Sequence, residues 1–240
     1  MKNLKLVALS ALMASSIVTQ VQAHAIWIAE RHDNLAIIYG DLSDQGYETK
    51  YVENLVAKKS NLSSGEININ IQEDHILFTV GEDVTYASAE YVRGYSTKDK
   101  EGKRFSLPKN EVENAVSSGY YVKYASHIAA TLTGKPKQQG IKLEILPLEN
   151  PTKLLPGSEL PIQVLFDGQP LAGVKVYGDY VTDHINTYTT DSEGKVTITV
   201  RNNGLNVIAA KYSLELKDDP TKDKFGYYST VSFKSAAKEH

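Results

Sequence analysis

Strand-length segments with alternating side chains recur along most of this 240-residue chain, and they limit its possible folds more than any other feature. In residues 66–72 isoleucine alternates with asparagine or glutamine, and residues 196–200 alternate in the same manner. A period of two places one set of side chains on each face of a half-buried strand. Turn dipeptides such as Asp167-Gly168 separate the segments. The pattern predicts an all-β protein.

The segments form two groups, which predict two β-sandwich-like domains. Residues 24–140 are β-rich and open with a hairpin at residues 25–39. Residues 141–234 hold about seven short strands with regularly spaced turns, which is typical of an immunoglobulin-like sandwich. Residues 235–240 are polar and predict a loose tail. One short helix is expected at residues 108–116, where a proline opens a segment that ends at Ser and Gly.

Composition restricts the chemistry that the chain can carry. It contains no cysteine, so disulfides, thiolate metal sites and cysteine nucleophiles are excluded. Any metal site must use histidine, carboxylate, amine or backbone donors. A formal net charge of −3 gives no electrostatic case for nucleic acid or anionic lipid as a partner. No apolar run after residue 23 reaches membrane-spanning length, so we expect no direct membrane insertion of the processed chain.

His24 acquires two donor groups if the preceding segment is removed. Residues 1–23 have the pattern of a secretory signal, because Lys2 and Lys5 precede a short apolar core that closes on the small residue Ala23. Cleavage after Ala23 makes His24 the first residue of an exported, periplasmic protein. Its α-amine, with a pKa of roughly 8, loses its proton to a metal near neutral pH at modest cost. Amine and imidazole on one residue form a chelate suited to copper or nickel.

This chelate needs partners, because these metals prefer about four donors in a tetragonal arrangement. We expect His75, which stands at a strand start, to be the best-placed partner, since strand ends meet at the rims of a sandwich. His32 is the second candidate, in the turn after the first strand, although His24 lies at the far end of that strand. Further possible donors, for which a structural or solvent-exposed role is the favoured interpretation, are His127, His184, Asp41, Asp44, Asp179 and Asp183.

Several segments resemble a family of exported bacterial proteins that is usually described as the periplasmic component of nickel or cobalt uptake systems. They are Ala23-His24-Ala25-Ile26-Trp27-Ile28, Ile38-Tyr39-Gly40, Ser118-Gly119-Tyr120-Tyr121-Val122-Lys123-Tyr124-Ala125, and residues 160–173, 190–195 and 201–208. The resemblance covers nearly the whole processed chain. Its C-terminal motifs recur in many β-sandwich modules and indicate the fold more than the metal. It implies delivery of metal to a membrane uptake transporter rather than catalysis.

We therefore expect a periplasmic nickel- or cobalt-binding accessory to metal uptake that is not an enzyme. The sequence lacks the serine-hydrolase elbow, the phosphate loop, the dinucleotide fingerprint and the His-Glu-x-x-His motif. Two alternatives stay open. The first is a copper protein, either a chaperone or an oxidative enzyme, because copper monooxygenases acting on polysaccharides also mature to an N-terminal histidine on a sandwich fold. The second is a metal-free adhesive or structural sandwich.

Overall fold

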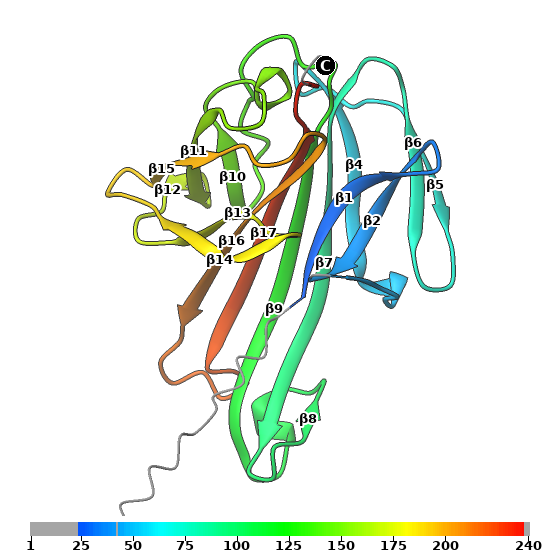
Figure 1. Cartoon of the computed structure of the whole chain (residues 1–240). Helices are drawn as coiled ribbons and strands as arrows, with labels where there is room; N and C mark the ends of the chain where they lie inside the picture. Colours follow the sequence, from blue (N-terminus) through cyan, green and yellow to red (C-terminus); the bar gives the residue numbers. More distant parts are fainter. Residues whose placement is uncertain (1–23, 42, 238–240) are drawn as a thin grey trace, which may run out of the picture.

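The computed structural model describes residues 24–41 and 43–237, which fold into three β-sheets (Figure 1). These residues contain no α-helix, and their helical turns are the single 3-10 turns η1 (Thr49–Tyr51), η2 (Lys109–Glu111) and η3 (Pro151–Lys153). The all-β prediction is confirmed. The predicted signal, residues 1–23, lies outside the described residues. Within the described part of the chain, no helix is long and apolar enough to cross a membrane.

Sheet A begins with the expected hairpin. Its strands run in the order β1 (Ala25–Arg31), β2 (Asn34–Gly40), β6 (Ile76–Val80) and β5 (Ile67–Ile71), and β3 (Asp44–Gln45) pairs with β2. His32 and Asp33 turn the hairpin with φ of 46° and 61°. Two turn residues at positive φ match the twist of the flanking strands, and they fix a register in which Ala25 lies opposite Gly40.

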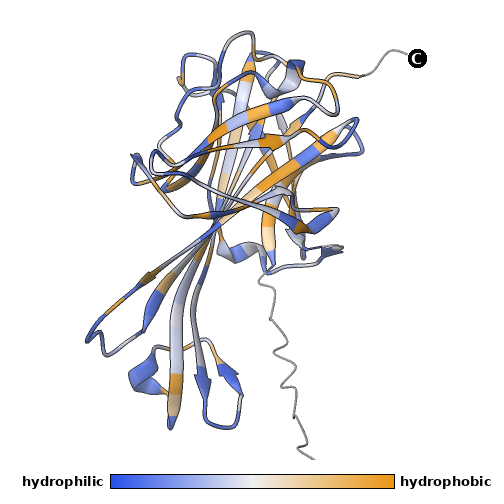
Figure 2. Ribbon diagram, turned by 60° about the vertical axis from the view of Figure 1, so that its left-hand side comes forward, coloured by the Kyte–Doolittle hydropathy of each residue, from blue (hydrophilic) through white to orange (hydrophobic). Residues whose placement is uncertain are grey.

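Sheet B is the largest sheet, and it joins both halves of the sequence. Its order is β14 (Asp183–Thr189), β13 (Lys175–Asp179), β16 (Leu205–Glu215), β17 (Lys224–Lys234), β9 (Ala115–Ile128), β7 (Val84–Asp99) and β4 (Val52–Lys59), with β8 (Arg104–Phe105) on β7. The parallel pair β9–β17 makes the junction, so strands from both sides of residue 140 share one sheet. The long strands extend beyond both other sheets (Figures 1 and 2).

Sheet C is small and comes entirely from the second half of the chain. It consists of β10 (Leu143–Pro147), β11 (Glu159–Phe166), β12 (Gln169–Pro170) and β15 (Lys195–Thr199), with β11 pairing with the other three. Its inner face carries Leu143, Leu160 and Ile162, which are fully buried in one core with residues of sheet B.

Sheet B is the middle of three layers, because alternate residues of its strands face different cores. In β16, Ile208 and Ala210 belong to the core shared with sheet C, whereas Val207 and Ala209 pack with residues of sheet A. The period of two therefore serves two interfaces at once. The sandwich-like arrangement agrees with the sequence pattern, and apolar residues gather where the layers overlap (Figure 2).

Sheet A is fastened to sheet B through the outer edge of β1. The hydroxyl of Thr230 donates to the Ile26 carbonyl at 2.7 Å, and the hydroxyl of Ser232 donates to the Ile28 carbonyl at 2.6 Å. Both hydroxyl residues are fully buried on β17. Side chains of sheet B thus satisfy β1 carbonyls that point away from β2, and this edge is closed.

Two local expectations are corrected. The helix expected at residues 108–116 is a single 3-10 turn followed by β9, because the Lys109 N–H donates to the Thr221 carbonyl at 2.7 Å and holds the segment against the β16–β17 connection. The strand expected at residues 66–72 forms, but it is not half-buried. Ile69 and Ile71 are 46% and 65% exposed, since β5 is the outermost strand of sheet A.

Candidate functional site

His24 stands at the free end of the β1–β2 hairpin. It directly precedes β1, and the pairing of Ala25 with Gly40 brings it beside Asp41. The side chains of His24 and Asp41 are 33% and 28% exposed. The imidazole Nε2 lies 3.8 Å from Asp41 Oδ2 and 3.1 Å from the amide nitrogen of Gln45 on β3. The imidazole is therefore held through Nε2 while it stays accessible to solvent.

Tyrosine rings and a buried lysine lie behind this imidazole. The Tyr39 ring centroid is 5.3 Å from that of His24, and the Tyr91 centroid is 5.3 Å from that of Tyr39. Lys123 Nζ lies 4.2 Å from the Tyr39 ring centroid and 5.4 Å from that of Tyr91. Such distances allow cation–π attraction, which partly offsets the loss of water around the ammonium.

Lys123 is only 6% exposed, although it carries an ammonium group. Burial, with a smaller contribution from the positive charge of Arg93, lowers the pKa of Lys123 to about 7. The Lys123 amine, which lies behind the His24 imidazole, can therefore gain or lose a proton near neutral pH. Strand alternation explains the position, because Lys123 shares a face of β9 with Ala125, which packs against sheet A.

His32 and His75 line a second feature, a cavity of about 340 Å³ on sheet A. His32 occupies the hairpin turn, at the opposite end of the hairpin from His24. His75 precedes β6, and its Nδ1 lies 2.7 Å from Asp74 Oδ1, a hydrogen bond that lowers the pKa of Asp74. Gln45 also lines this cavity. It therefore borders the same cavity as His32 and His75, and it contacts His24 as well.

The three predicted metal ligands are not brought together in one group. Among residues 24–41 and 43–237, no set of three His, Asp or Glu side chains converges as a metal cluster would. His24 has Asp41 beside it, and His75 has Asp74, so each imidazole has its own carboxylate. A carboxylate beside an imidazole is the usual arrangement for orienting a metal ligand. At His24 the described residues provide such a carboxylate, Asp41, but no second histidine lies in a cluster with them.

The remaining candidate donors have structural partners. His127 is buried against the Ser232 hydroxyl at 3.0 Å, and burial lowers its pKa to about 4. His184 stacks on Tyr180 with ring centroids 4.6 Å apart. Asp183 pairs with Arg201 and accepts hydrogen bonds from Asn186, which lower the pKa of Asp183 to about 2. The expectation of ordinary roles for these residues agrees with these contacts.

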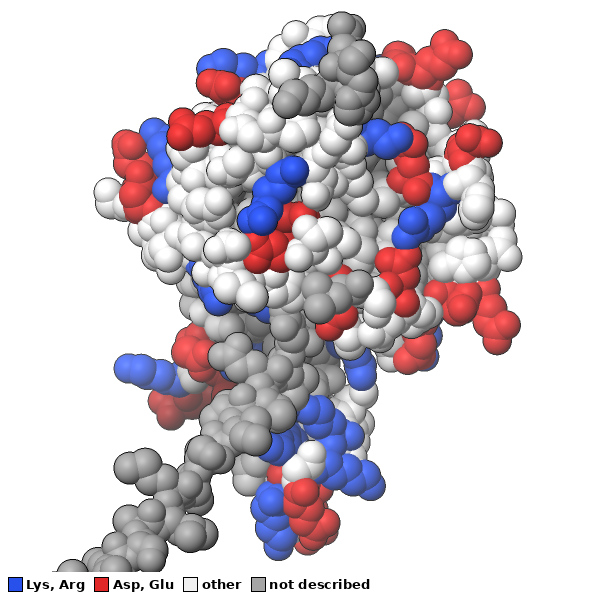
Figure 3. Space-filling model, in the orientation of Figure 1, with Lys and Arg blue, Asp and Glu red and all other residues white. Residues whose placement is uncertain are grey.

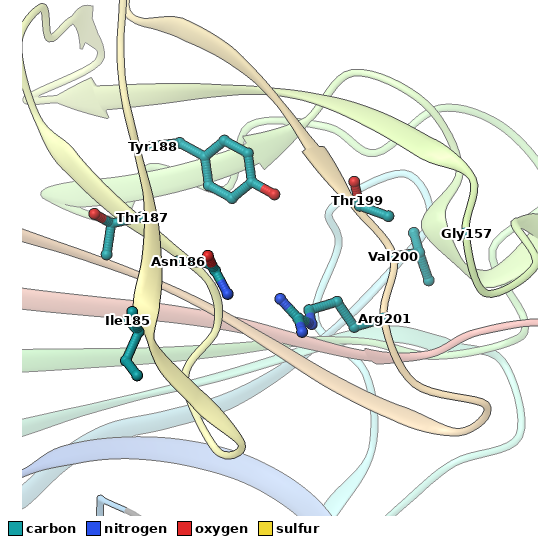
Figure 4. A pocket seen from close by; sticks show the side chains of 8 residues that line it. All are labelled: Gly157, Ile185, Asn186, Thr187, Tyr188, Thr199, Val200 and Arg201. Carbon is teal, nitrogen blue, oxygen red and sulfur yellow. The ribbon is translucent and has the colours of Figure 1, made fainter.

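A larger, shallow cavity of about 720 Å³ lies between β14 and β15 (Figure 4). It is lined by Gly157, Ile185, Asn186, Thr187, Tyr188, Thr199, Val200 and Arg201. Asn186 and Arg201 point toward one another in this view, and Asp183 holds both. The lining contains no His, Asp or Glu, so it supplies none of the side chains that a transition metal prefers.

Charged groups are interspersed over the face shown in Figure 3, where acidic and basic side chains lie next to each other. Ion pairs among the described residues include Lys59 with Asp83 at 2.6 Å and Lys142 with Asp167 at 3.1 Å. A face of this kind has no extended field of one sign.

Sequence reasoning named His24 and Asp41 but missed Gln45, Tyr39 and Lys123. Gln45 lies in a polar loop without periodicity, and only its pairing with Tyr39 places it at the imidazole. A signal for Lys123 was present, because it is a lysine between tyrosines in a segment of strand character. Its burial depends on sheet A, whose position over sheet B the local pattern does not contain.

Comparison with known proteins identifies the family and leaves its activity open. No protein of curated function and no solved structure matches the chain. A family model described as a domain of unknown function, DUF4198, matches residues 21–214. This span covers most of the chain, including His24, the Gln45 contact and all but the last strand of sheet B. The chain therefore belongs to the DUF4198 family.

Proposed function

We propose that the processed chain is a periplasmic binding protein for nickel or cobalt, which it holds at His24 as an accessory to a membrane uptake transporter. The observation that carries the proposal is the position of His24. It directly precedes β1, its side chain is one-third exposed, and its imidazole is held at Nε2 by Gln45 beside Asp41. The proposal requires cleavage after Ala23, which makes the α-amine of His24 a ligand.

The contacts with Gln45 and Asp41 involve Nε2, so the other ring nitrogen, Nδ1, is the one that can chelate a metal together with the α-amine. Amine and Nδ1 of one histidine close a six-membered ring on a metal, so Nδ1 is the ligand expected in this site. Metal at Nδ1 requires the ring proton to sit on Nε2, where it needs an acceptor. In the structure the Gln45 amide nitrogen faces Nε2 at 3.1 Å as a donor, so metal at Nδ1 requires this amide to turn its oxygen toward Nε2, or Asp41 at 3.8 Å to move and accept the proton. The negative charge of Asp41 also favours a bound cation.

Two strong donors on an accessible residue suit a protein that must release its metal. Carboxylate or water would complete the nitrogen and oxygen shell that nickel and cobalt accept. A transporter could approach the exposed side of His24 and supply competing donors. His32 and His75 line the neighbouring cavity and are separate from this primary site.

The test is calorimetric titration of the chain beginning at His24 with nickel, cobalt and copper. The matched control keeps the natural residues 19–23 before His24, which leaves the imidazole in place but moves the free amine away from it. We expect the control to bind at least about tenfold more weakly, because one chelating donor is lost. The variants H24A and D41N should also weaken binding, whereas H32A and H75A should not.

Three outcomes decide between the readings. Equal binding by the processed and extended forms would show that the site is elsewhere. No binding of any metal by the processed form would leave the structural or adhesive reading. Binding of copper alone, with peroxide formation when a reductant is added, would favour the oxidative copper alternative, for which Tyr39 supplies the aromatic neighbour.

A further inference from the structure

Strand β5 presents an open and uncharged edge. It is the outermost strand of sheet A (Figure 1), and among the described residues it pairs only with β6. Ile67, Ile69 and Ile71 alternate with Asn68 and Asn70, and no charged residue interrupts them. Ile69 and Ile71 are 46% and 65% exposed. An exposed apolar edge without charges is a template for pairing with another strand.

The alternation of hydrogen bonds between β5 and β6 shows which backbone groups of β5 point outward. The N–H of Gln72 donates to the His75 carbonyl at 2.9 Å, and the Glu66 carbonyl accepts from Gly81 at 3.1 Å. Even-numbered residues therefore face β6. Antiparallel ladders alternate, so the N–H and carbonyl groups of Ile67, Ile69 and Ile71 point away from β6. The same three residues carry the apolar side chains.

The β1 and β4 edges carry protective features that β5 lacks. The β1 edge is closed by the Thr230 and Ser232 hydroxyls. The β4 edge of sheet B is irregular, because its register with β7 shifts twice, and it ends on Lys58 and Lys59. Bulges and lysines are common ways to prevent edge pairing. The β14 edge of sheet B has an irregular register with β13 and begins at the ion-paired Asp183, whereas the register of β5 with β6 is regular and its residues carry no charge.

The sequence of β5 is complementary to itself in one antiparallel register. If Ile69 faces Ile69 of a second copy, Ile67 faces Ile71, and every outward backbone group meets a partner. In this register Glu66 lies opposite Gln72 and Glu73 lies opposite Gly65, so no two carboxylates face each other. A shift by two residues toward the C-terminus would instead put Glu73 opposite Ile69.

We propose that two copies of this chain pair through β5, antiparallel and with Ile69 on the two-fold axis. Sheet A then continues from one protomer into its partner, and the exposed isoleucines pack against their counterparts. An isologous contact of this kind closes after two copies. Because β5 and β1 are opposite edges of sheet A, the dimer leaves His24 accessible. The proposal therefore stands apart from the metal site.

Cysteine cross-linking tests the register directly, because the chain has no cysteine of its own. In the proposed dimer, I69C brings two Cα atoms to about 5.5 Å, within disulfide range. I71C is the matched control. It is the more exposed position, but the register separates the two copies of residue 71 by about 14 Å along the strands. With oxidised glutathione and a chelator present, I69C should cross-link at least about tenfold faster than I71C. Equal rates at the two positions would overturn the register.

Sedimentation of the unmodified chain tests the association itself. We expect a dimer that forms with rising concentration and that I69K abolishes, since the substitution sets two ammonium groups against each other. I185K is the control, because Ile185 is 90% exposed on the edge strand β14. Circular dichroism should show both variants folded. A monomer at all concentrations, or loss of the dimer in both variants, would exclude β5 pairing.

Discussion

At the scale of single residues, Lys123 is the most unusual group in the molecule. Its ammonium is removed from water between the rings of Tyr39 and Tyr91, and no ion pair with a carboxylate is present among the described residues to compensate. Burial lowers the pKa of Lys123 to about 7, so the folded state binds this proton less tightly than the unfolded chain does.

Replacing this lysine should stabilise the protein. The unfolded chain holds the proton up to a pKa of about 10.4, so between pH 7 and that value it binds more protons than the folded state, and stability rises with pH. We expect K123M to raise the free energy of unfolding at pH 7 by roughly 1–3 kcal/mol. It should also flatten the rise between pH 7 and 10, measured by urea denaturation. A lower stability in K123M would mean that the aromatic contacts outweigh the lost hydration.

At the scale of elements, the attachment of β1 to β17 depends on two hydroxyl groups. Each satisfies a carbonyl that neither β2 nor water reaches, so removing one leaves a buried acceptor unpaired. The exposed ion pair of Lys234 with Glu30 also joins the two strands, and the remaining contact is apolar packing in which Trp27 is almost fully buried.

T230V keeps the shape of the side chain and removes its donor. We expect a loss of about 1–3 kcal/mol in the free energy of unfolding, because the Ile26 carbonyl stays buried without a partner. T197V on the exposed face of β15 is the control and should change stability by less than about 0.5 kcal/mol. Similar effects in the two variants would show that the hydroxyl is not what holds the edge. Thermal and urea unfolding report both.

Local sequence patterns predicted elements well and neighbours poorly. The β1–β2 hairpin was evident because its turn residues are adjacent in sequence. The strand at β5 was also evident, but the exposure of its isoleucines depends on what lies across from it. The 3-10 turn at Lys109 replaced a helix because of a contact with Thr221, over a hundred residues away. The position of His24 was predicted, whereas Gln45 and Lys123 reach it through pairings that no local period contains.

At the scale of the whole molecule, sheet B makes the two halves of the sequence interdependent. β9 and β17 pair along ten residues in parallel, and parallel pairs form only when distant segments meet. All three hydrophobic cores use side chains of this sheet.

We therefore expect the processed chain to unfold in one cooperative transition. Calorimetry should give a single peak whose calorimetric and van't Hoff enthalpies agree. The fragments 24–140 and 141–234, made separately, should stay largely unfolded, because each would expose half of sheet B. Two resolved transitions, or a fragment that folds alone, would instead support the division at residue 140 that the sequence pattern suggests.

The closed edge of β1 also affects how the chain end behaves. Ala25 and Ile26, the two residues after His24, are fully buried, Ala25 pairs with Gly40, and the Ile26 carbonyl accepts from Thr230, so the proposed ligand is not on a loose tail. Its conformational entropy is lost when the protein folds and does not have to be lost again when an ion binds. An aminopeptidase needs several free residues to engage a chain, and here it would have to pull β1 out of the core first. In a chain that begins at His24, as proposed, folding would thus preserve the terminal amine.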